Sequence, residues 1–365
     1  MSRPVILLLL LLFPLIAGCG FKDMDKRFIV KAIGIDKSDD REHPLLVSLK
    51  LAIPSSQIKP GQSNTFQIIS DQAASMTEAV RHLKAKVDKD LDFSQAKIII
   101  FGKSLAEERL DRESIDWFMR KREMQGTTFM AVGDPSAEQV LKVKPRSERL
   151  PADSLILSFD QEGTESSYIV TEFLFDFHRR LSEKGLDPYL PVIKPLSESY
   201  LIDRVAVCDK ERVVDILSPD ETRIFNELSK KIDKFDITTR ADPIHFAMSI
   251  LKFGYSYTID EGSFAEPALN MKIHMRGQVA ESSLPMEYSD WKPYELEAEK
   301  EAAARYEGVL KKFQAIQVDP IGLGLRYRAT RHRRDQEWEQ WQALYPKLVF
   351  HVHVYVDILG SGGMK

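Results

Sequence analysis

The first twenty residues constrain this chain most, because they indicate whether the chain is exported and which residues remain in the mature protein. Arg3 gives a short positive start, and residues 5–17 form an unbroken apolar run with no charge before Lys22. A basic start followed by a short apolar core is the layout of a secretory signal. The run is shorter than the ~20 residues that a membrane-spanning helix needs. We therefore predict a signal peptide over residues 1–18 that is removed from the mature chain.

The end of this apolar run has the form of a lipobox, the motif for lipid attachment to a cysteine. Ile16, Ala17 and Gly18 stand directly before Cys19. Small residues fit a signal-peptidase groove, and the thiol is a nucleophile for a diacylglyceryl group. We predict a covalent diacylglycerol and an N-acyl chain on Cys19, and a lipidated tether over 19–27. Acyl chains contribute ~0.8 kcal/mol per buried methylene, so two or three of them give a firm anchor. An uncleaved anchor helix and an ordinary export signal with an incidental Cys19 remain open.

The length and composition of the chain after the signal peptide limit its number of domains, its disulfides and its partners. Removal of 18 residues from 365 leaves 347, more than one compact core usually holds, so two or three domains are expected. Only Cys208 remains once Cys19 is lipidated, so an intrachain disulfide is excluded. A formal net charge of −4 gives no overall attraction to nucleic acid, and we predict none as a partner.

In the first half, predicted strands and helices alternate as in a layered α/β unit. Met76, Val80, Leu83 and Val87 form one stripe of an amphipathic helix, and residues 97–102 read as a buried strand. Further strands are expected at 28–35, 45–53 and 127–132, and helices at 72–88, 111–124, 136–143 and 167–182. We predict an N-terminal domain over 28–195, as one unit or two subdomains.

A break at 185–191, rich in proline and glycine, marks the predicted boundary, and a C-terminal α+β domain is expected over 200–365. Ser218, Pro219 and Glu221 form a helix start with its cap, a first-turn proline and an acidic residue. Strands are expected at 202–207, 213–217, 244–258, 268–280 and 347–359, and helices at 218–231, 293–314 and 335–345. The predicted fold class is α+β, with mixed and antiparallel sheets and packed helices.

The search for catalytic or metal-binding motifs returns no complete site. The sequence lacks a nucleophile elbow, a zinc-protease motif and a Walker loop, and Gly322-x-Gly324 is interpreted as a turn. His351 and His353 share one face of a strand, but a third ligand is not evident. An acidic stretch lacks the spacing of a calcium loop and is interpreted as a solvated turn: Asp36, Asp39, Asp40 and Glu42. We predict no enzymatic activity, no metal and no cofactor apart from the lipid.

One basic patch is a candidate contact site for a membrane or a partner. Five arginines fall within nine residues, with Trp338 and Trp341 close behind: Arg326, Arg328, Arg331, Arg333 and Arg334. For a membrane-tethered protein such a patch could meet anionic headgroups, at roughly 1 kcal/mol per basic residue, or an acidic partner subunit. A charged loop that faces water is the alternative interpretation.

Taken in order along the chain, the motifs resemble those of the Ger(x)C-family spore germination lipoproteins, the C subunits of nutrient germinant receptors. The resemblance rests on the lipobox and on five later segments: Gly34-Ile35-Asp36-Lys37, residues 77–81, residues 93–107, residues 206–217, and Asp319-Pro320-Ile321-Gly322-Leu323-Gly324 with Trp341 and the final strand. The chain departs from the usual family pattern at Gly20, Gln95 and Cys208. These departures bear on subfamily and partner identity.

The resemblance implies an accessory subunit anchored on the outer face of the spore inner membrane, beside two integral-membrane subunits of a nutrient receptor. It brings no enzymatic role. We expect the chain to support nutrient-triggered germination through contacts with those subunits and with the bilayer. The alternative is a solute-binding lipoprotein that captures a small nutrient itself. Such a protein usually has two doubly wound lobes around a cleft, whereas this second half reads as antiparallel.

Overall fold

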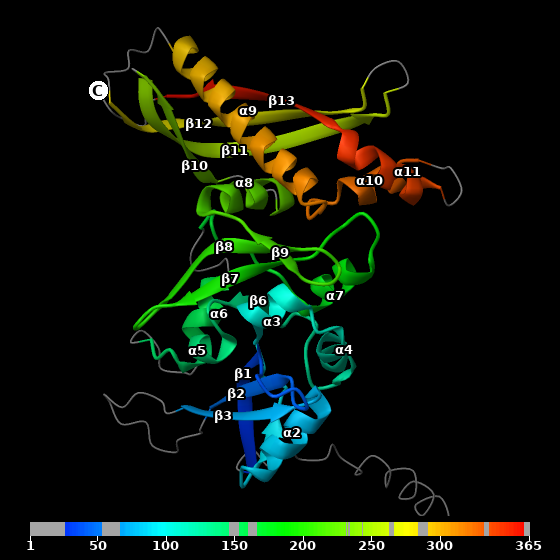
Figure 1. Cartoon of the computed structure of the whole chain (residues 1–365). Coiled ribbons are helices and arrows are strands. Elements are labelled where there is room, and N and C mark those ends of the chain that lie inside the picture. Colours follow the sequence, from blue (N-terminus) through cyan, green and yellow to red (C-terminus); the bar gives the residue numbers. More distant parts are fainter. Residues whose placement is uncertain are drawn as a thin grey trace, which may run out of the picture.

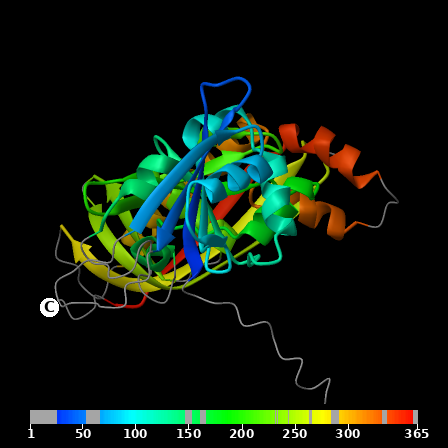
Figure 2. The ribbon, with the colours of Figure 1, turned by 90° about the horizontal axis from the view of Figure 1, so that it is seen from below.

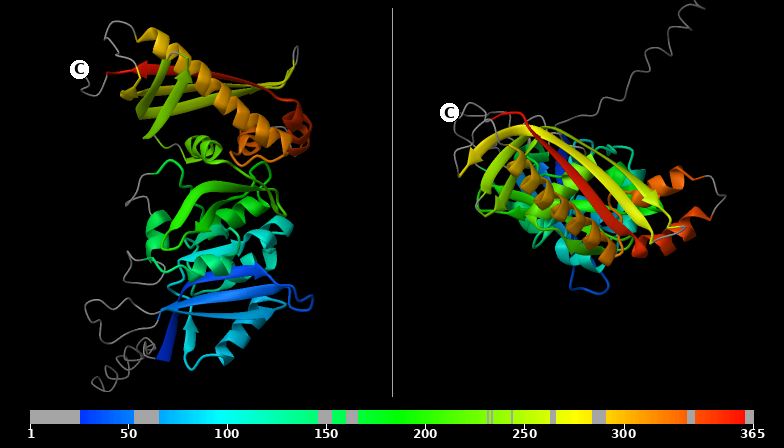
Figure 3. Two further views of the ribbon diagram at one scale, coloured as in Figure 1. Left: turned by 60° about the vertical axis from the view of Figure 1, so that its left-hand side comes forward. Right: turned by 90° about the horizontal axis from the view of Figure 1, so that it is seen from above.

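The computed structural model shows an elongated molecule built from two β-sheets with a helix between them (Figure 1). The structure describes residues 26–52, 66–145, 153–159, 166–230, 232, 234–242, 244–262, 266–283, 291–331 and 336–360. The larger sheet lies toward the start of the described chain, and the smaller sheet lies at the opposite end of the molecule (Figures 1 and 3). The predicted α+β class with mixed and antiparallel sheets is confirmed.

The first sheet has nine strands, in the order β3-β2-β1-β5-β6-β7-β8-β9, with β4 also pairing with β1. The three strands β1, β5 and β6 run parallel to one another and β7 continues the parallel set, whereas both flanks are antiparallel. The strand bounds are β1 Arg27–Lys37, β2 Leu45–Ala52, β3 Phe66–Ala73, β4 Asp90–Asp92, β5 Ile98–Gly102, β6 Phe129–Gly133, β7 Tyr189–Pro195, β8 Tyr200–Cys208 and β9 Val213–Ile216.

Helices cover both faces of this sheet, which explains why β5 is apolar at almost every position. Ile99 and Phe101 join one core with α2, α4 and α7, while Ile98 and Ile100 join a second core with α5 and α6. A parallel strand covered on both faces is expected to be a continuous hydrophobic run. The helix bounds are α2 Met76–Ala85, α3 Lys103–Glu108, α4 Arg112–Arg120, α5 Ala137–Lys142, α6 Asp153–Phe159 and α7 Leu174–Ser182.

The second sheet has four strands in the order β10-β11-β12-β13, and one long helix, α9, crosses it (Figure 1). The bounds are β10 Phe235–Ala241, β11 Ile244–Asp260, β12 Ala268–Ser282, α9 Lys292–Ala315 and β13 Val349–Ile358. The first three strands are antiparallel, and α9 forms the crossover between the parallel strands β12 and β13. The remaining short helices are α10 Leu323–Ala329, α11 Glu337–Leu344 and the 3-10 turn Tyr345–Lys347.

Charged side chains of α9 bind the outer backbone groups of both edge strands. On β13 the amides of Ile358, Val356 and Val352 donate to the carboxylates of Glu295, Glu299 and Glu307, at 3.1, 3.1 and 3.4 Å. Four helical residues rise ~6 Å, close to the ~6.6 Å of two strand residues, so the two spacings match.

On β10 the amide of Arg240 donates to Glu301 at 2.8 Å, and Arg305 donates to the carbonyl of Thr238 at 2.8 Å. The same helix therefore occupies part of both edges of the sheet, where free backbone groups would otherwise be able to pair with another strand.

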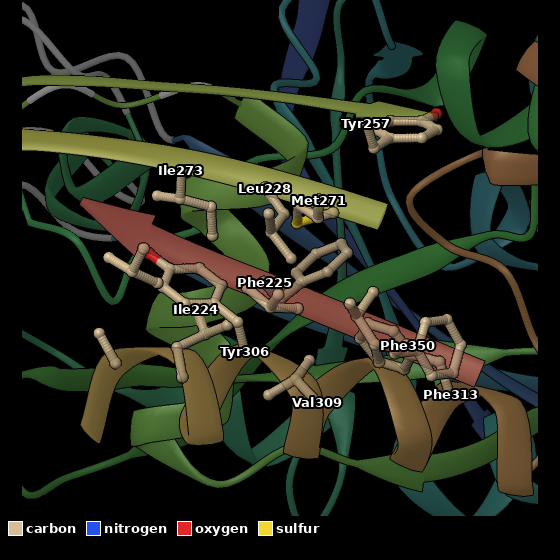
Figure 4. Close-up of a cluster of buried hydrophobic side chains, with 14 of the residues drawn as sticks. Ile224, Phe225, Leu228, Tyr257, Met271, Ile273, Tyr306, Val309, Phe313 and Phe350 are labelled. Carbon is tan, nitrogen blue, oxygen red and sulfur yellow. The ribbon is translucent and has the colours of Figure 1, made fainter. Parts of the chain in front are cut away.

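Helix α8, Pro219–Lys230, lies between the two sheets and belongs to a core shared by both (Figure 1). Phe225 meets Tyr189 of β7 edge-on at 4.8 Å and Phe313 of α9 at 6.0 Å between ring centroids. Figure 4 shows Phe225 and Leu228 directed toward Met271 and Tyr306 of the second sheet and its helix. This shared core packs β7 and β8 of the first sheet against the second sheet and α9.

The structure corrects two local predictions near the expected boundary. The predicted helix 167–182 begins only at Leu174. The side-chain amide of Asn226 donates to the carbonyls of Ser167 and Ile169, and an isolated β-bridge joins Phe173 to Phe129. These contacts use backbone groups before Leu174 in place of helical hydrogen bonds. The predicted break at 185–191 ends inside a strand, β7. Strand β8 pairs with β7, so the first sheet continues across the interval 195–200 as far as Ile216.

Candidate functional site

The lipobox and its cysteine lie outside the described residues. Ile16, Ala17, Gly18 and Cys19 all precede Lys26, where the described chain begins one residue before β1. Within the part of the chain that the structure describes, every helix is too short or too polar to cross a bilayer. Lipidation at Cys19 therefore stays a prediction.

Three of the five patch arginines are described, and each has contacts within the molecule. Arg326 lies over the ring of Tyr257 at 4.4 Å. Arg328 pairs with Glu183 at 3.1 Å and binds the carbonyl of Lys184. Arg331 pairs with Glu261 and lies over Tyr327 at 4.0 Å. These contacts attach α10 to β11 and to the end of α7.

Arg333 and Arg334 lie outside the described residues. The structure thus brings Arg326, Arg328 and Arg331 to the same helix end but gives each an internal structural role. Contact of the patch with a membrane or a partner stays a prediction.

A buried carboxyl group organises the segment that enters α10. Asp319 accepts from the amides of Gly322, Leu323 and Gly324 at 2.9, 3.0 and 2.6 Å. Gly322 has φ +86°, a conformation that favours glycine, and a Cβ on Gly324 would lie 2.3 Å from the Trp341 indole nitrogen. Burial raises the pKa of Asp319 to about 7, although the three amides oppose that shift. The turn predicted at Gly322-x-Gly324 is therefore a capped helix start packed against an aromatic ring.

This turn is bonded to the first sheet through Asp187. The backbone amide of each residue donates to the other: Asp187 to the Asp319 carbonyl at 2.9 Å, and Asp319 to the Asp187 carboxylate at 2.7 Å. Lys210, from the turn after β8, pairs with Asp187 at 3.1 Å. Burial lowers the pKa of Lys210.

Arg180 of α7 completes this junction between the two parts. Its guanidinium donates to the carbonyls of Asp187 and Pro320, both at 3.1 Å, and pairs with buried Glu172 at 3.6 Å. It also lies over the ring of Tyr189 at 4.5 Å. We call Arg180, Asp187, Lys210 and Asp319 the junction cluster. Sequence reasoning missed Arg180 and Asp187; the signal available was the Asp-Pro-x-Gly-x-Gly segment, whose aspartate precedes two glycines that admit a close backbone approach.

A cavity of about 350 Å³ lies beside the junction cluster. Its lining includes Asp187 just before β7, Asp209 and Lys210 just after β8, and three residues of α11: Trp338, Trp341 and Gln342. Asp187 and Lys210 bind each other, while Asp209 accepts from the amides of Glu211 and Arg212 at 2.7 Å. The charged groups of this cavity therefore already have partners in the protein.

A second buried carboxyl, Glu227 of α8, lies between α8 and α9. It is 1% exposed, pairs with Arg223 at 3.2 Å and accepts from the hydroxyl of Tyr306. Burial raises the pKa of Glu227 from 4.5 to about 7, more than Arg223 and Tyr306 lower it. The unfolded chain releases this proton near its ordinary pKa. Between these two values the folded chain holds more protons, so its stability must fall as pH rises.

The Glu227→Gln variant is expected to remove this pH dependence. Between pH 5 and pH 8 the wild type should lose up to about 3 kcal/mol of unfolding free energy relative to the variant, since each pKa unit corresponds to ~1.4 kcal/mol. Urea denaturation of both proteins across this pH range measures the difference. Parallel stability curves for the two proteins would show that Glu227 does not titrate in this window.

The other residues that the sequence analysis considered, two histidines, an aspartate and a cysteine, have surroundings that fit a structural role. His351 and His353 of β13 lie in register with Asn270 and Lys272 of β12, and a lysine opposite His353 disfavours a cation there. Within the described residues, groups of three or more ligating side chains that could hold a metal are absent. Asp36 is buried rather than solvated, because it accepts from the amides of Ala137 and Glu138 at the start of α5. Cys208 is buried, and burial raises the pKa of its thiol.

Comparison with known proteins defines the class of molecule to which this fold belongs. The solved structure titled "Crystal Structure of the GerBC protein" superposes with a TM-score of 0.58 at 14% identity, covering 93% of this chain and 100% of that one. The "Spore germination protein GerQC" of Bacillus cereus is 22% identical over 369 residues, with 99% of each chain covered. The "Spore germination protein KC" of Bacillus subtilis (strain 168) is 22% identical over 380 residues, covering 95% of this chain and 92% of that protein.

Two family descriptions together match nearly the whole chain. Residues 20–195 match the spore germination protein N-terminal domain, and residues 203–362 match the spore germination B3/GerAC-like C-terminal domain. The chain therefore belongs to the family of C subunits of germinant receptors, as the sequence resemblance predicts, and its role lies in spore germination.

Proposed function

We propose that this chain is a lipid-anchored, non-enzymatic subunit of a nutrient germinant receptor on the outer face of the spore inner membrane. It supports germination by contacts with two integral-membrane subunits. The observation that carries the proposal is the match of both family domains, in order, over nearly the whole chain. The lipobox at residues 16–19 supports the anchor.

The internal chemistry of the body favours a contact role over catalysis. Two buried carboxyl groups whose pKa values are raised to about 7, Asp319 and Glu227, each bind protein groups: backbone amides in one case, Arg223 and Tyr306 in the other. Perturbed carboxyl groups often mark active sites, but here they join structural elements. They therefore supply no free acid or base to a substrate.

The alternative function, capture of a nutrient by this chain, would use a cavity such as the one beside the junction cluster. Its charged groups are already paired, so a polar nutrient entering it would have to displace internal hydrogen bonds. A second cavity of about 450 Å³, between α2 and α4, mixes Arg109 and Arg120 with Asp116 beside Trp117. Asp116 pairs with Arg120 at 3.4 Å. These pairings favour the contact role.

We expect the purified body, residues 22–365, to bind none of the amino acids, sugars or nucleosides that trigger the spores, while deletion of the gene abolishes the response of its receptor. Calorimetric titration and germination of the deletion strain measure the two effects. Crosslinking in spore membranes, followed by identification of the attached proteins, tests the contacts. Saturable binding of a triggering nutrient that the Trp338→Ala variant abolishes would replace this proposal with the nutrient-capture function.

A further inference from the structure

We propose that one end of the molecule, which we call the β1 end, rests on the headgroups of the bilayer and that the second sheet is held away from it. The β1 end comprises residues 26–28 and 84–92, which are the start of β1, the last residues of α2, the turn after it and β4. These segments are adjacent because Arg27 and Phe28 pair with Asp90 and Leu91. This proposal rests on the lipid anchor proposed above.

The length of the tether limits which surface can reach the membrane. Arg27 stands eight positions after Cys19, and a fully extended chain covers at most about 3.5 Å per position, or about 28 Å. A compact body of this length has a radius of gyration of about 20 Å and so a diameter of about 50 Å. The tether is therefore shorter than the body, and the start of β1 must stay close to the headgroups.

The arrangement of the fold then determines which elements lie near the bilayer and which lie far from it. In Figures 1 and 3, β1 and α2 lie at one end of the long axis, and β11, β12 and β13 lie at the other. The view along that axis in Figure 2 shows β1, β2 and α2 in front of the remaining elements. The first sheet runs from β1 through β5 and β6 to β7 and β8, and the core around α8 joins β7 and β8 to the second sheet, so the two ends are held in place relative to each other. An anchor at the first residue of β1 thus places the second sheet far from the bilayer.

The charges of the β1 end suit an anionic headgroup surface. The end carries five basic residues and three acidic ones, in a chain whose formal charge is −4: Lys26, Arg27, Lys84, Lys86 and Lys89 against Asp88, Asp90 and Asp92. Three of the basic groups are ion-paired: Arg27 with Asp92 at 2.8 Å, Lys84 with Asp90 at 2.6 Å, and Lys86 with Asp71 of β3 at 2.9 Å, so the excess with Asp71 included is one positive charge. The excess positive charge attracts anionic lipid, at ~1 kcal/mol per basic residue near the surface.

The test uses the full lipidated chain in vesicles of phosphatidylcholine and phosphatidylglycerol, a fraction of which carries a headgroup nitroxide. Two matched variants place a fluorophore on a new exposed cysteine: Ala85→Cys at the β1 end and Ser256→Cys on β11. Native Cys208 is buried and escapes labelling, and Cys19 carries the lipid. Quenching should be several-fold stronger at position 85 than at position 256.

Vesicle flotation of the same samples tests the lipid anchor separately from the orientation of the body. A chain that does not float with the vesicles lacks the anchor, and the proposed function then fails together with the orientation. A chain that floats but shows equal quenching at both positions, or stronger quenching at 256, overturns the orientation alone. Weak quenching at position 85 in floating samples would likewise overturn the orientation, because the anchored chain would then keep the β1 end away from the headgroups.

Discussion

Replacement of Arg180 by methionine is expected to lower the free energy of unfolding by about 3–5 kcal/mol, the usual effect of removing one partner of a buried ion pair. Arg180 is only 7% exposed and is the basic partner of fully buried Glu172. The variant also loses the donors to the carbonyls of Asp187 and Pro320, which join the two parts of the body. Urea denaturation of residues 22–365, followed by tryptophan fluorescence, measures the loss.

The neighbouring residue provides a matched control. Arg179 pairs with Asp176 at the surface, where its side chain is 48% exposed, so Arg179→Met should cost less than about 1 kcal/mol. A loss of similar size in both variants would mean that the junction cluster adds no stability beyond that of a surface pair. A third variant, Arg180→Lys, keeps the charge but not the fork of donors, and should recover only part of the loss.

Replacement of Cys19 by alanine is expected to abolish lipid attachment, block normal processing after Gly18 and release the chain from the membrane fraction. Without the thiol, the diacylglyceryl group has no nucleophile to join, and membrane affinity from acyl chains disappears. Metabolic labelling with a fatty-acid analogue, together with fractionation, measures both effects.

The second cysteine supplies the control for this experiment. Cys208 is buried in the first sheet, so Cys208→Ala should leave the lipid label unchanged. Equal labelling of the Cys19→Ala protein and the wild type would place the lipid elsewhere and remove the basis for the anchored function.

The sequence predicted those elements whose signals are local. The cap and first-turn proline at 218–221 indicated α8 to within a residue of its observed start and end. The strands expected at 244–258 and 268–280 are the paired strands β11 and β12, and the stripe from Met76 to Leu83 indicated α2. In each case the residues that decide the structure lie within a few positions of one another.

Features that depend on distant partners could not be predicted in this way. Strand β7 contains Pro191 and follows a glycine-proline segment, so its local pattern suggests a break, yet β6 and β8 hold it on both sides. The interpretation of Asp36 as part of a solvated turn was wrong because the amides that bind it come from α5, a hundred residues further along the chain. The junction cluster likewise joins Arg180 to Pro320 across 140 residues.

The contacts that the glutamates and the arginine of α9 make with the edge strands of the second sheet affect how neighbouring copies of the chain can pair with one another. The lipid anchor proposed above would confine the molecules to two dimensions, where neighbours collide at far higher effective concentration than in solution. A four-stranded sheet with bare edges would then risk joining the sheets of adjacent copies into a growing ribbon. The amides of Val352, Val356, Ile358 and Arg240 are already occupied, so a strand of another copy could not pair with them.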